Sequence, residues 1–459
     1  MKSYRGLPVL AGVCSLEEAQ RPGLSVAASV ARLKRHHYAL KRLHGIFTAR
    51  ITAEPIYELK MAFSRHAHLC AEHVAALRER VSEMREPPLG LDAVPDAALE
   101  IFYDEILAAP TTAELVLGLY EKAVPAVQRE LEAHVADTNR LTDNPTVRVC
   151  RFALLELGDI AEFGRQAVGC LVDEATRRQA AGWLALLDDC LAGKTPSRQY
   201  SATPYIYDRM PHRDERFKDN YNMGVNAEVF LYDPQYPASV KVLMMYYKRL
   251  REIDVPEMMA SIVTETPDKP WGYYRDMTRQ IWDEARHAMM GEVGFANLQV
   301  DWPDKVMINF TWSVGLNTQL QPWERHGVLY FIEQGLMPKT GKRFEWETAL
   351  AAANPLSATM QDFDWADEVL HARIGRTWYV SQFKTATDAV AYGDKCWSKV
   401  LADWRGWRDQ GLTQHRNWWP DLYNAYCQQH DIAPDPKIAA YHETYETTRA
   451  DLKSITGSA

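Results

Sequence analysis

The pattern Asp-Glu-x-x-His occurs at Asp283–His287 (DEARH) and again at Asp367–His371 (DEVLH). Residues three apart on an α-helix share one face, so each copy places a carboxylate beside an imidazole. Carboxylate and imidazole ligands without a thiolate favour iron or manganese over structural zinc. Four-helix bundles that hold two such ions use Glu-x-x-His twice and add one Glu from each of the other two helices. The sequence should therefore supply two further Glu residues, one before each motif.

The first of these Glu residues is predicted from the geometry of a helical hairpin. The turn at 266–270 (TPDKP) has its centre 16 residues before Glu284. Antiparallel helices joined there place Glu252, another 16 residues back, at the level of Glu284. Glu257 lies on the same predicted helix and is the alternative ligand, because a kink at Pro256 would change the level.

The second Glu is predicted in the same way. Glu333 lies 35 residues before Glu368, which leaves about 17 residues on each side of a turn, close to the spacing of the first hairpin. Glu324 lies 44 residues before Glu368 and is the less favourable alternative. The predicted metal ligands are thus Glu252, Glu284, His287, Glu333, Glu368 and His371.

Three residues beside the ligands have predicted supporting roles. Asp283 and Asp367 each precede a ligating Glu and are expected to orient a ligand histidine through its second ring nitrogen. Arg286 is expected to neutralise such a carboxylate. The alternative for both Asp residues is a solvated position on the helix surface.

Most of the remaining chain has the periodicity of α-helices. Apolar residues recur at three- and four-residue intervals over 25–48, 56–81, 112–138 and 145–191, and again over 239–265, 271–298, 306–335 and 343–390, with a break near 354–355. We therefore predict an all-α protein with a helical bundle at 1–193, a crossover at 194–238, a second bundle at 239–385 and a helical extension at 386–459. The extension contains Trp397, Trp404, Trp407, Trp418 and Trp419, and we expect it to pack back on the second bundle because exposed Trp is costly.

The first bundle is predicted to be a degenerate copy of the second. A shift of 214 residues places Cys70 where the second bundle has Glu284, and a shift of 212 places Asp159 where it has His371. The copied ligand set is therefore broken, and a scaffolding role is expected. The alternative is a separate metal site at the nearby residues His66, His68, Glu72 and His73.

Charge and cysteine content restrict the partners and the compartment. The 459 residues carry 52 Lys and Arg against 61 Asp and Glu, a net charge of −9, which disfavours nucleic acid and anionic membrane surfaces. No apolar run approaches the roughly 18 residues that span a bilayer. The 7 cysteines form no CxxC pair and are best explained as free thiols in a reducing compartment. We expect a cytoplasmic protein.

Residues 240–380 resemble the ferritin-like di-metal carboxylate superfamily. The DEARH motif matches the D-E-x-R-H motif of bacterial multicomponent monooxygenase hydroxylases, whereas DEVLH departs from it at Leu370. The closer likeness is to a bacterial group of ferritin-like proteins related to the tRNA-hydroxylating monooxygenase. It rests on the Glu pair at 252 and 257, the P-D-x-P-W turn at 267–271, the Glu and Gly-Leu turn at 333–336, and D-E-V-x-H-x-x-I-G at 367–375.

This resemblance implies tandem ferritin-like four-helix bundles and an O₂-activating di-iron oxidase or oxygenase. Two iron ions, or manganese in their place, would be bridged by Glu284 and Glu368, which the resemblance makes the catalytic carboxylates. A small organic substrate and an electron-donating reductase are the expected partners. The alternatives are a ferroxidase or iron-storage protein and a non-catalytic scaffold stabilised by metal. Cage-forming ferritins are short single bundles, so the second bundle and the Trp-rich extension favour a discrete enzyme.

Overall fold

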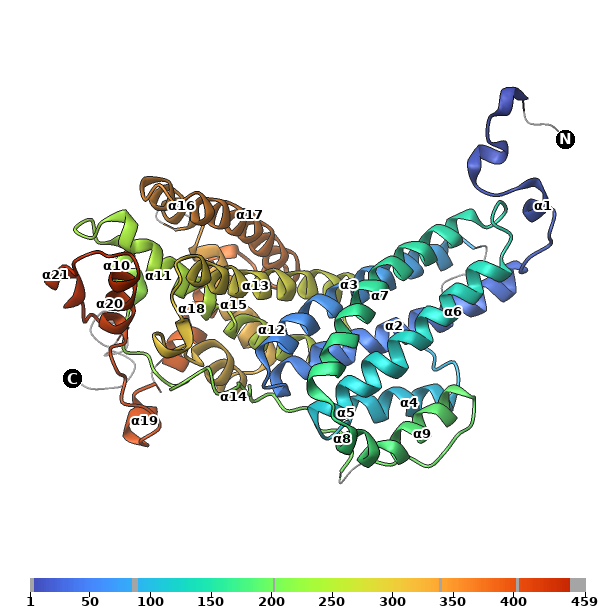
Figure 1. The fold of residues 1–459 in the computed structure, drawn as a ribbon, viewed down its shortest axis with the longest axis horizontal. Coiled ribbons are helices and arrows are strands. Elements are labelled where there is room, and N and C mark those ends of the chain that lie inside the picture. The colour runs from blue at the N-terminus through green and yellow to red at the C-terminus, as the bar shows by residue number, and fades with distance from the viewer. Residues whose placement is uncertain (1–3, 85–89, 201–202, 338–340, 402–403, 446–459) are drawn as a thin grey trace. The chain divides into compact units, whose positions relative to one another are not determined.

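The computed structural model describes residues 4–84, 90–200, 203–337, 341–401 and 404–445 (Figure 1). No helix in these ranges is long and apolar enough to cross a membrane. The chain divides into two compact units: unit 1 comprises Met1–Arg50 and His66–Tyr207, and unit 2 comprises Ile51–Arg65 and Asp208–Ala459. All regular secondary structure in the described ranges is helical, which confirms the predicted all-α class.

The long helices of unit 1 are α2 (Val26–Ala53) up to Arg50, α3 (Tyr57–Ser82) from His66 onward, α6 (Val124–Asp137) and α7 (Asn144–Leu171). A hydrogen bond of 3.0 Å between His36 Nε2 and His134 Nδ1 joins α2 to α6. An ion pair of 2.7 Å between His73 and Glu156 joins α3 to α7, and α6 packs against α7. The shorter helices are α1 (Leu16–Ala19), α4 (Ala97–Leu107), α5 (Thr112–Val116), α8 (Glu174–Gln179) and α9 (Ala181–Leu191).

Two long helices predicted for unit 1 are interrupted in the structure. The stretch 145–191 forms α7, α8 and α9, because the Asp173 side chain accepts the Thr176 N–H at 2.7 Å and starts α8 as an N-cap. The stretch 112–138 contains a π-helical turn at Leu117–Ala123 before α6 begins. Pro125 lies in the first turn of α6 and has no N–H for the usual helical bond. Both corrections come from local capping and proline chemistry that periodicity does not reveal.

Unit 2 contains helices of very different length. The long ones are α11 (Ala238–Arg251), α12 (Asp254–Thr264), α13 (Trp271–Asn297), α15 (Pro322–Gly335), α17 (Pro355–Trp378) and α18 (Ala386–Leu401). The shorter ones are α10 (Ala227–Tyr232), α14 (Leu316–Gln319), α16 (Lys342–Ala351), α19 (Trp404–Asp409), α20 (Trp419–Gln429) and α21 (Pro436–Ala439). The break predicted near 354–355 is confirmed, since the Asn354 side chain caps α17 and Pro355 is its first residue.

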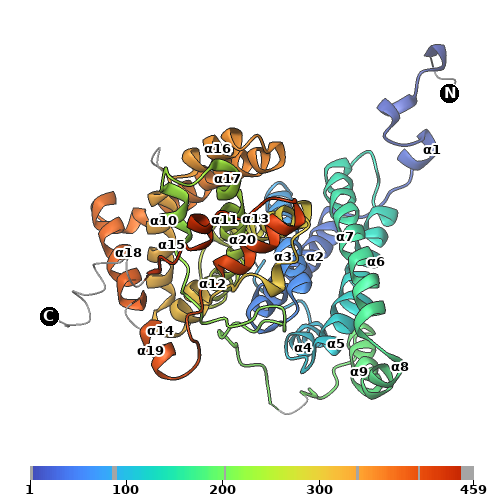
Figure 2. The ribbon, with the colours of Figure 1, turned by 60° about the vertical axis from the view of Figure 1, so that its left-hand side comes forward.

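Four helical segments of unit 2 surround one interior (Figure 2). The segments are α11 with α12, α13, α15 and α17: α13 packs against α11, α12 and α17, and α15 packs against α12 and α17. Outside this set, α16 lies against α11 and α17, and α18 lies against α15. Both Asp-Glu-x-x-His motifs lie on helices that line this interior, α13 and α17.

Two helices of this set begin or break where the sequence places a proline. The predicted helix 239–265 divides at Glu252 into α11 and α12, because Pro256 has no N–H to offer the Glu252 carbonyl four residues earlier. That carbonyl accepts the N–H of Val255 instead, at 3.1 Å. The predicted helix 306–335 is also interrupted, since α15 begins only at Pro322. The first break leaves Glu252 at the end of α11 rather than within a continuous helix.

The Trp-rich extension packs into the core of unit 2, as the sequence predicts for it. Trp418 and Trp419 are buried and belong to the same hydrophobic cluster as Phe230 and Tyr247. The indole N–H of Trp419 donates to the Ile438 carbonyl at 2.8 Å. Trp397 is buried and the ring of Trp407 contacts Tyr221, whereas the side chain of Trp404 lies outside the described residues.

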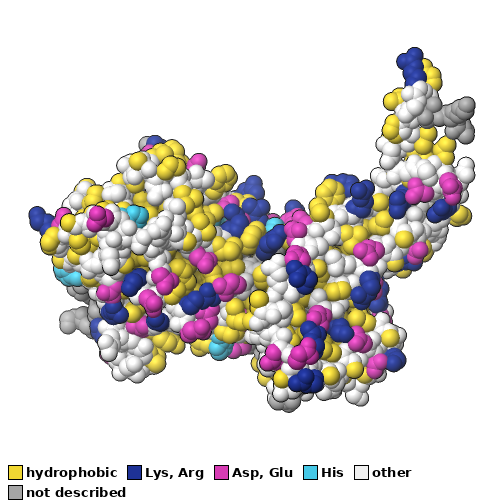
Figure 3. Space-filling view, in the orientation of Figure 1, with side chains coloured by type: hydrophobic (Ala, Val, Ile, Leu, Met, Phe, Trp, Pro, Cys, Tyr) yellow, Lys and Arg dark blue, Asp and Glu magenta, His cyan; other side chains and the backbone are white. Residues whose placement is uncertain are grey.

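Charged side chains of both signs are interspersed over the surface that Figure 3 presents. Elsewhere in the described chain, side chains of opposite charge at the surface form pairs, for example Arg216 with Glu58 at 2.7 Å and Lys122 with Asp188 at 2.7 Å. Such exposed pairs contribute little to stability.

The contact between α11 and α13 depends on glycine. A Cβ atom added to Gly291 would lie 2.3 Å from the backbone nitrogen of Leu250, and one added to Gly294 would lie 2.3 Å from Cδ1 of Tyr246. Both separations are well below van der Waals contact. Glycine at these positions therefore lets α13 approach the end of α11 that carries Glu252.

Replacing Gly291 with Ala should lower the free energy of unfolding by about 1–3 kcal/mol, because the α11 backbone has to move away. Urea unfolding followed by circular dichroism measures this loss. The matched control is Gly272→Ala on the same helix, where the new Cβ would meet Trp378 at 3.5 Å, an ordinary contact. An equal loss of stability in both variants would contradict the close backbone contact at Gly291.

Candidate metal centre

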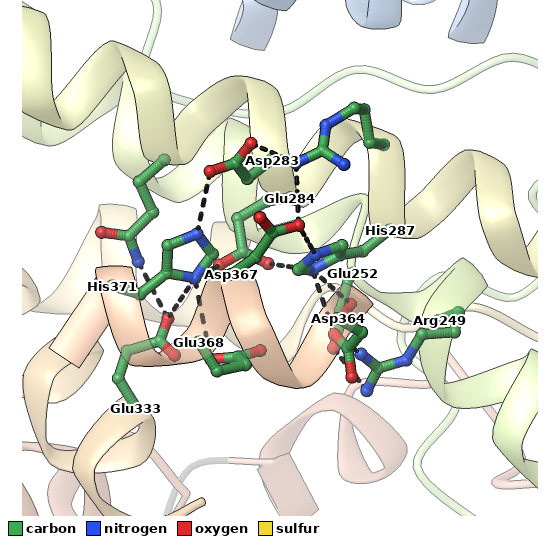
Figure 4. A network of polar contacts seen from close by, with 12 residues as sticks. Arg249, Glu252, Asp283, Glu284, His287, Glu333, Asp364, Asp367, Glu368 and His371 are labelled. Carbon is green, nitrogen blue, oxygen red and sulfur yellow. Dashed lines mark hydrogen bonds and ion pairs between the residues drawn. The ribbon is translucent and has the colours of Figure 1, made fainter. Parts of the chain in front are cut away.

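Two groups of potential metal ligands lie next to each other in the interior of unit 2 (Figure 4). Site A comprises Glu252, His287, Asp364 and Glu368, and site B comprises Glu284, Glu333, Glu368 and His371. Within each group the ligand atoms all lie within 4.8 Å of one another, and Glu368 belongs to both. The structure therefore brings together all six residues predicted as metal ligands.

The two motifs face each other because α13 and α17 run antiparallel. Each aspartate contacts the histidine of the opposite motif: Asp367 Oδ2 lies 3.1 Å from Nε2 of His287, and Asp283 Oδ2 lies 3.4 Å from Nε2 of His371 (Figure 4). An Nε2–H that donates to a carboxylate leaves Nδ1 of the same ring as an acceptor. Both imidazoles thus present Nδ1 to the interior.

The carboxylates gather around these two Nδ1 atoms. Around Nδ1 of His287 lie Glu252 Oε2 at 3.3 Å, Asp364 Oδ1 at 3.3 Å and Glu284 Oε2 at 3.5 Å. Around Nδ1 of His371 lie Glu284 Oε1 at 3.1 Å, Glu368 Oε2 at 3.6 Å and Glu333 Oε1 at 3.9 Å. Glu284 therefore directs one oxygen to each imidazole, which is the position of a bridging ligand.

Several inward atoms of the centre make no hydrogen bond with the described residues. They are Nδ1 of both histidines and the Oε2 atoms of Glu252, Glu333 and Glu368. Buried polar atoms in proteins are almost always satisfied, so a cluster of exceptions needs an explanation. A carboxylate and imidazole set of this kind fits iron or manganese. The unsatisfied atoms and their chemistry both match a centre for two cations.

The centre is shielded from solvent. The Glu252 side chain is 17% exposed, and the side chains of the other ligands of sites A and B are 7% exposed or less. Gln280 fixes one of them, since its Nε2 donates to Glu333 Oε1 at 2.9 Å. Preorganised ligands in a buried site are typical of metal centres that exclude competing water.

The buried carboxylates raise the pKa values of both imidazoles. Burial alone would lower the pKa of His287, but Asp364 and its neighbours raise it well above its usual value. In the same way Glu284 outweighs burial and raises the pKa of His371. Burial and the adjacent Glu368 raise the pKa of Glu333. Metal binding requires deprotonated ligands, so an ion entering this centre should release protons.

Arginines hold the two outer aspartates. Arg279 Nε donates to Asp283 Oδ2 at 2.9 Å. Arg286 donates to Asp367 at 2.8 Å and also contacts Asp283, so one guanidinium joins the two aspartates that hold the histidines. Neither aspartate is a solvated surface residue, since their side chains are 0% and 14% exposed. Arg286 thus lies where it can neutralise both aspartates, as its place in the DEARH motif predicts.

Three residues of the centre were not predicted from the sequence: Asp364, Lys342 and Arg249. Asp364 precedes Glu368 by four residues, so helical spacing already placed it on the ligand face of α17. Lys342 Nζ lies 2.8 Å from Glu368 Oε1 and 2.9 Å from Asp364 Oδ2. Arg249 contacts Asp364 and lies 2.9 Å from Glu252 Oε1. No sequence signal marks the lysine, because it starts the separate helix α16.

The two alternative ligands lie elsewhere. The Glu257 carboxylate is buried against two cations, 2.9 Å from Arg213 Nη2 and 3.0 Å from Lys60 Nζ. Glu324 belongs to the capping box of α15, where its Oε2 accepts the Gln321 N–H at 2.8 Å. Both residues are therefore engaged in structural interactions away from the cluster.

No protein-family model, curated protein or solved structure matches this chain. The reading of the centre therefore rests on its own residues and geometry. Unit 1 offers no second candidate: among the described residues, the groups of His, Cys, Asp and Glu that could hold a metal are sites A and B alone. At the copied positions in unit 1, Cys70 is buried, His73 pairs with Glu156, and His66 Nδ1 lies 3.1 Å from the Tyr120 hydroxyl.

Replacing Glu252 with Ala should weaken metal binding at site A at least about tenfold. Loss of a group that only supports a ligand already lowers metal affinity by about tenfold or more, and Glu252 is a proposed ligand itself. Glu257→Gln is the matched control and should retain the metal content of the wild type. Anaerobic titration with Mn²⁺, followed by calorimetry and metal analysis after gel filtration, measures both.

The control variant Glu257→Gln is itself expected to be less stable than the wild type. Removing the Glu257 charge leaves Arg213 and Lys60 partly uncompensated, so stability should fall by about 3–5 kcal/mol even though the folded protein binds metal. If Glu257→Gln lost metal and Glu252→Ala kept it, the assignment of the two glutamates would be reversed.

Proposed function

We propose that the protein is an O₂-activating non-haem di-iron oxidase or oxygenase that acts on a small organic substrate. The observation that carries this proposal is the pair of buried imidazoles whose Nδ1 atoms face one carboxylate cluster, each held from behind by an aspartate. Two iron ions, when bound, supply the redox chemistry with O₂, and the protein supplies position and surroundings. The resemblance of residues 240–380 to ferritin-like di-metal proteins supports the same reading.

The charge of the cluster favours two cations over one. Five carboxylates surround the centre, those of Glu252, Glu284, Glu333, Asp364 and Glu368. Lys342 and Arg249 contact three of them, so once the imidazoles give up their protons the cluster carries an excess of negative charge. Buried carboxylates without a counter-charge are strongly unfavourable, so divalent cations suit this interior. Manganese has the same ligand preference and is the alternative metal.

The residues of the chain have separable roles in this proposal. Glu284 and Glu368 would each help to hold both ions, since each lies within reach of both sites. Asp283 and Asp367 are positioning residues that hold the imidazoles. The burial of the ligands keeps bulk water from the reacting groups. An external reductase would provide the electrons for each turnover, unless the substrate itself provides them.

The decisive experiment is O₂ uptake by protein loaded anaerobically with Fe²⁺. We expect about two iron ions per chain and rapid use of about one O₂ per iron pair. Glu284→Ala and His371→Ala should each abolish loading of the iron pair and O₂ uptake while leaving the far-ultraviolet circular dichroism helical. The control Glu324→Gln alters a carboxylate outside the centre and should keep both.

Three results would contradict the proposal. Rapid oxidation of many iron ions per chain would indicate iron storage instead. Iron binding without O₂ uptake, with or without a reductant, would indicate a metal-stabilised scaffold. Retention of two iron ions by Glu284→Ala or His371→Ala would mean that the ligand set is wrong.

A further inference from the structure

Sites A and B differ in the permanent charges that touch their ligands. At site A, Arg249 lies 2.9 Å from Glu252 and contacts Asp364, and Lys342 lies 2.9 Å from Asp364. Each site A carboxylate therefore has a neighbouring cation, because Lys342 also reaches Glu368. Like charges close together in a low-dielectric interior repel strongly. A cation entering site A meets two resident cations.

At site B, among the described residues, a Lys or Arg side chain contacts a ligand only through the shared Glu368, which Lys342 touches. Its Glu333 is held by the neutral amide of Gln280, at 2.9 Å. Its Glu284 contacts the imidazoles of His287 and His371 and no Lys or Arg side chain. The outer arginine Arg286 does not distinguish the sites, because it contacts the aspartates behind both histidines.

Lys342 also fixes the carboxylate that the two sites share. Its Nζ donates to Glu368 Oε1 at 2.8 Å, whereas Oε2 of the same carboxylate lies 3.6 Å from Nδ1 of His371 in site B. Glu368 thus has one oxygen held by the ammonium and one directed to site B.

We propose that Lys342 is a positioning residue that makes the two metal sites unequal, so that site B binds the first divalent ion and site A binds the second more weakly. Before an ion at site A can bind Glu368, Glu368 Oε1 has to give up its contact with the Lys342 ammonium. The lysine and Arg249 lower the affinity of site A, and the lysine orients the bridge toward site B. This inference rests on the metal centre of the proposed function but makes no use of O₂ chemistry.

The test is an anaerobic titration with Mn²⁺ alone, read by calorimetry and by electron paramagnetic resonance. In the wild type we expect two binding steps separated by at least about tenfold in affinity. At one equivalent the spectrum should be that of isolated Mn²⁺, and the signal of a coupled pair should appear only as the second equivalent binds. His371→Ala should remove the tight step, and His287→Ala should remove the weak one.

Lys342→Met should bring the two affinities within about threefold of each other, so that coupled pairs appear already at one equivalent. Lys342→Arg keeps the positive charge and should keep the two steps apart. Lys241→Met is the matched control, because it also removes a nearly buried lysine, 5% exposed, that lies against the Phe344 ring and outside the centre. It should titrate like the wild type.

The proposal is overturned if the wild type binds two ions with equal affinity, if Lys342→Met keeps the two steps apart, or if His371→Ala retains the tight step. If Lys342→Met fails to fold, the two histidine variants still test whether the sites are unequal, because they show which site binds the first ion. Unequal binding of Mn²⁺ without O₂ uptake by the iron-loaded protein would refute the proposed function alone. Equal binding with O₂ uptake would refute the unequal sites alone.

Discussion

Burial of like charge is the constraint on which the rest of unit 2 depends. Five carboxylates share one helical interior with two imidazoles, and an isolated buried carboxylate costs several kcal/mol. The compensating positive charges come from helices outside the four segments that surround this interior, or from the ends and outer faces of those segments. Lys342 comes from α16, Arg249 from the last turn of α11, and Arg279 and Arg286 from the outer face of α13. The helices that pack against the core thus also balance its charge.

A second buried charge cluster in the same unit shows what a purely structural arrangement looks like. Arg213 and Lys60 face Asp254 and Glu257, so two cations meet two anions, and all four side chains are at most 1% exposed. Each of the four is directly paired. The candidate metal centre differs because its carboxylates outnumber its Lys and Arg side chains and inward nitrogen and oxygen atoms stay unsatisfied. Charge imbalance together with unsatisfied atoms distinguishes a ligand set from a buried salt-bridge network.

The sequence predicted the all-α class and the six residues that converge, because both follow from local rules. Helical spacing pairs Glu with His in each motif, and the length of the hairpin around 266–270 selects Glu252 over Glu257. The helix breaks between Glu252 and Pro256, and Glu252 itself still follows directly on the last turn of α11. The break therefore did not remove Glu252 from the level predicted for it. Helix ends were less predictable, since a single cap such as Asp173 divides a stretch whose periodicity continues.

The residues that the sequence did not reveal depend on tertiary packing. Asp364 had the right spacing on α17, but nothing in the pattern requires a fifth carboxylate. Lys342 reaches the centre only because α16 lies against α11 and α17. Its position some 26 residues before Glu368 has no periodic relation to the motif. Long-range partners of this kind follow from how helices pack and not from spacing along one of them.

The crossed pairing of aspartate and histidine has one further consequence. Because Asp283 meets His371 and Asp367 meets His287, α13 and α17 are related by a local pseudo-twofold axis that passes between them. The axis equates Gln280 with Asp364, each three residues before the Asp of its motif. One end of the centre therefore carries a neutral amide where the other carries a carboxylate with its own counter-ions. A symmetric pair of helices would present two equivalent sites, and this departure from symmetry makes the two ends of the centre different.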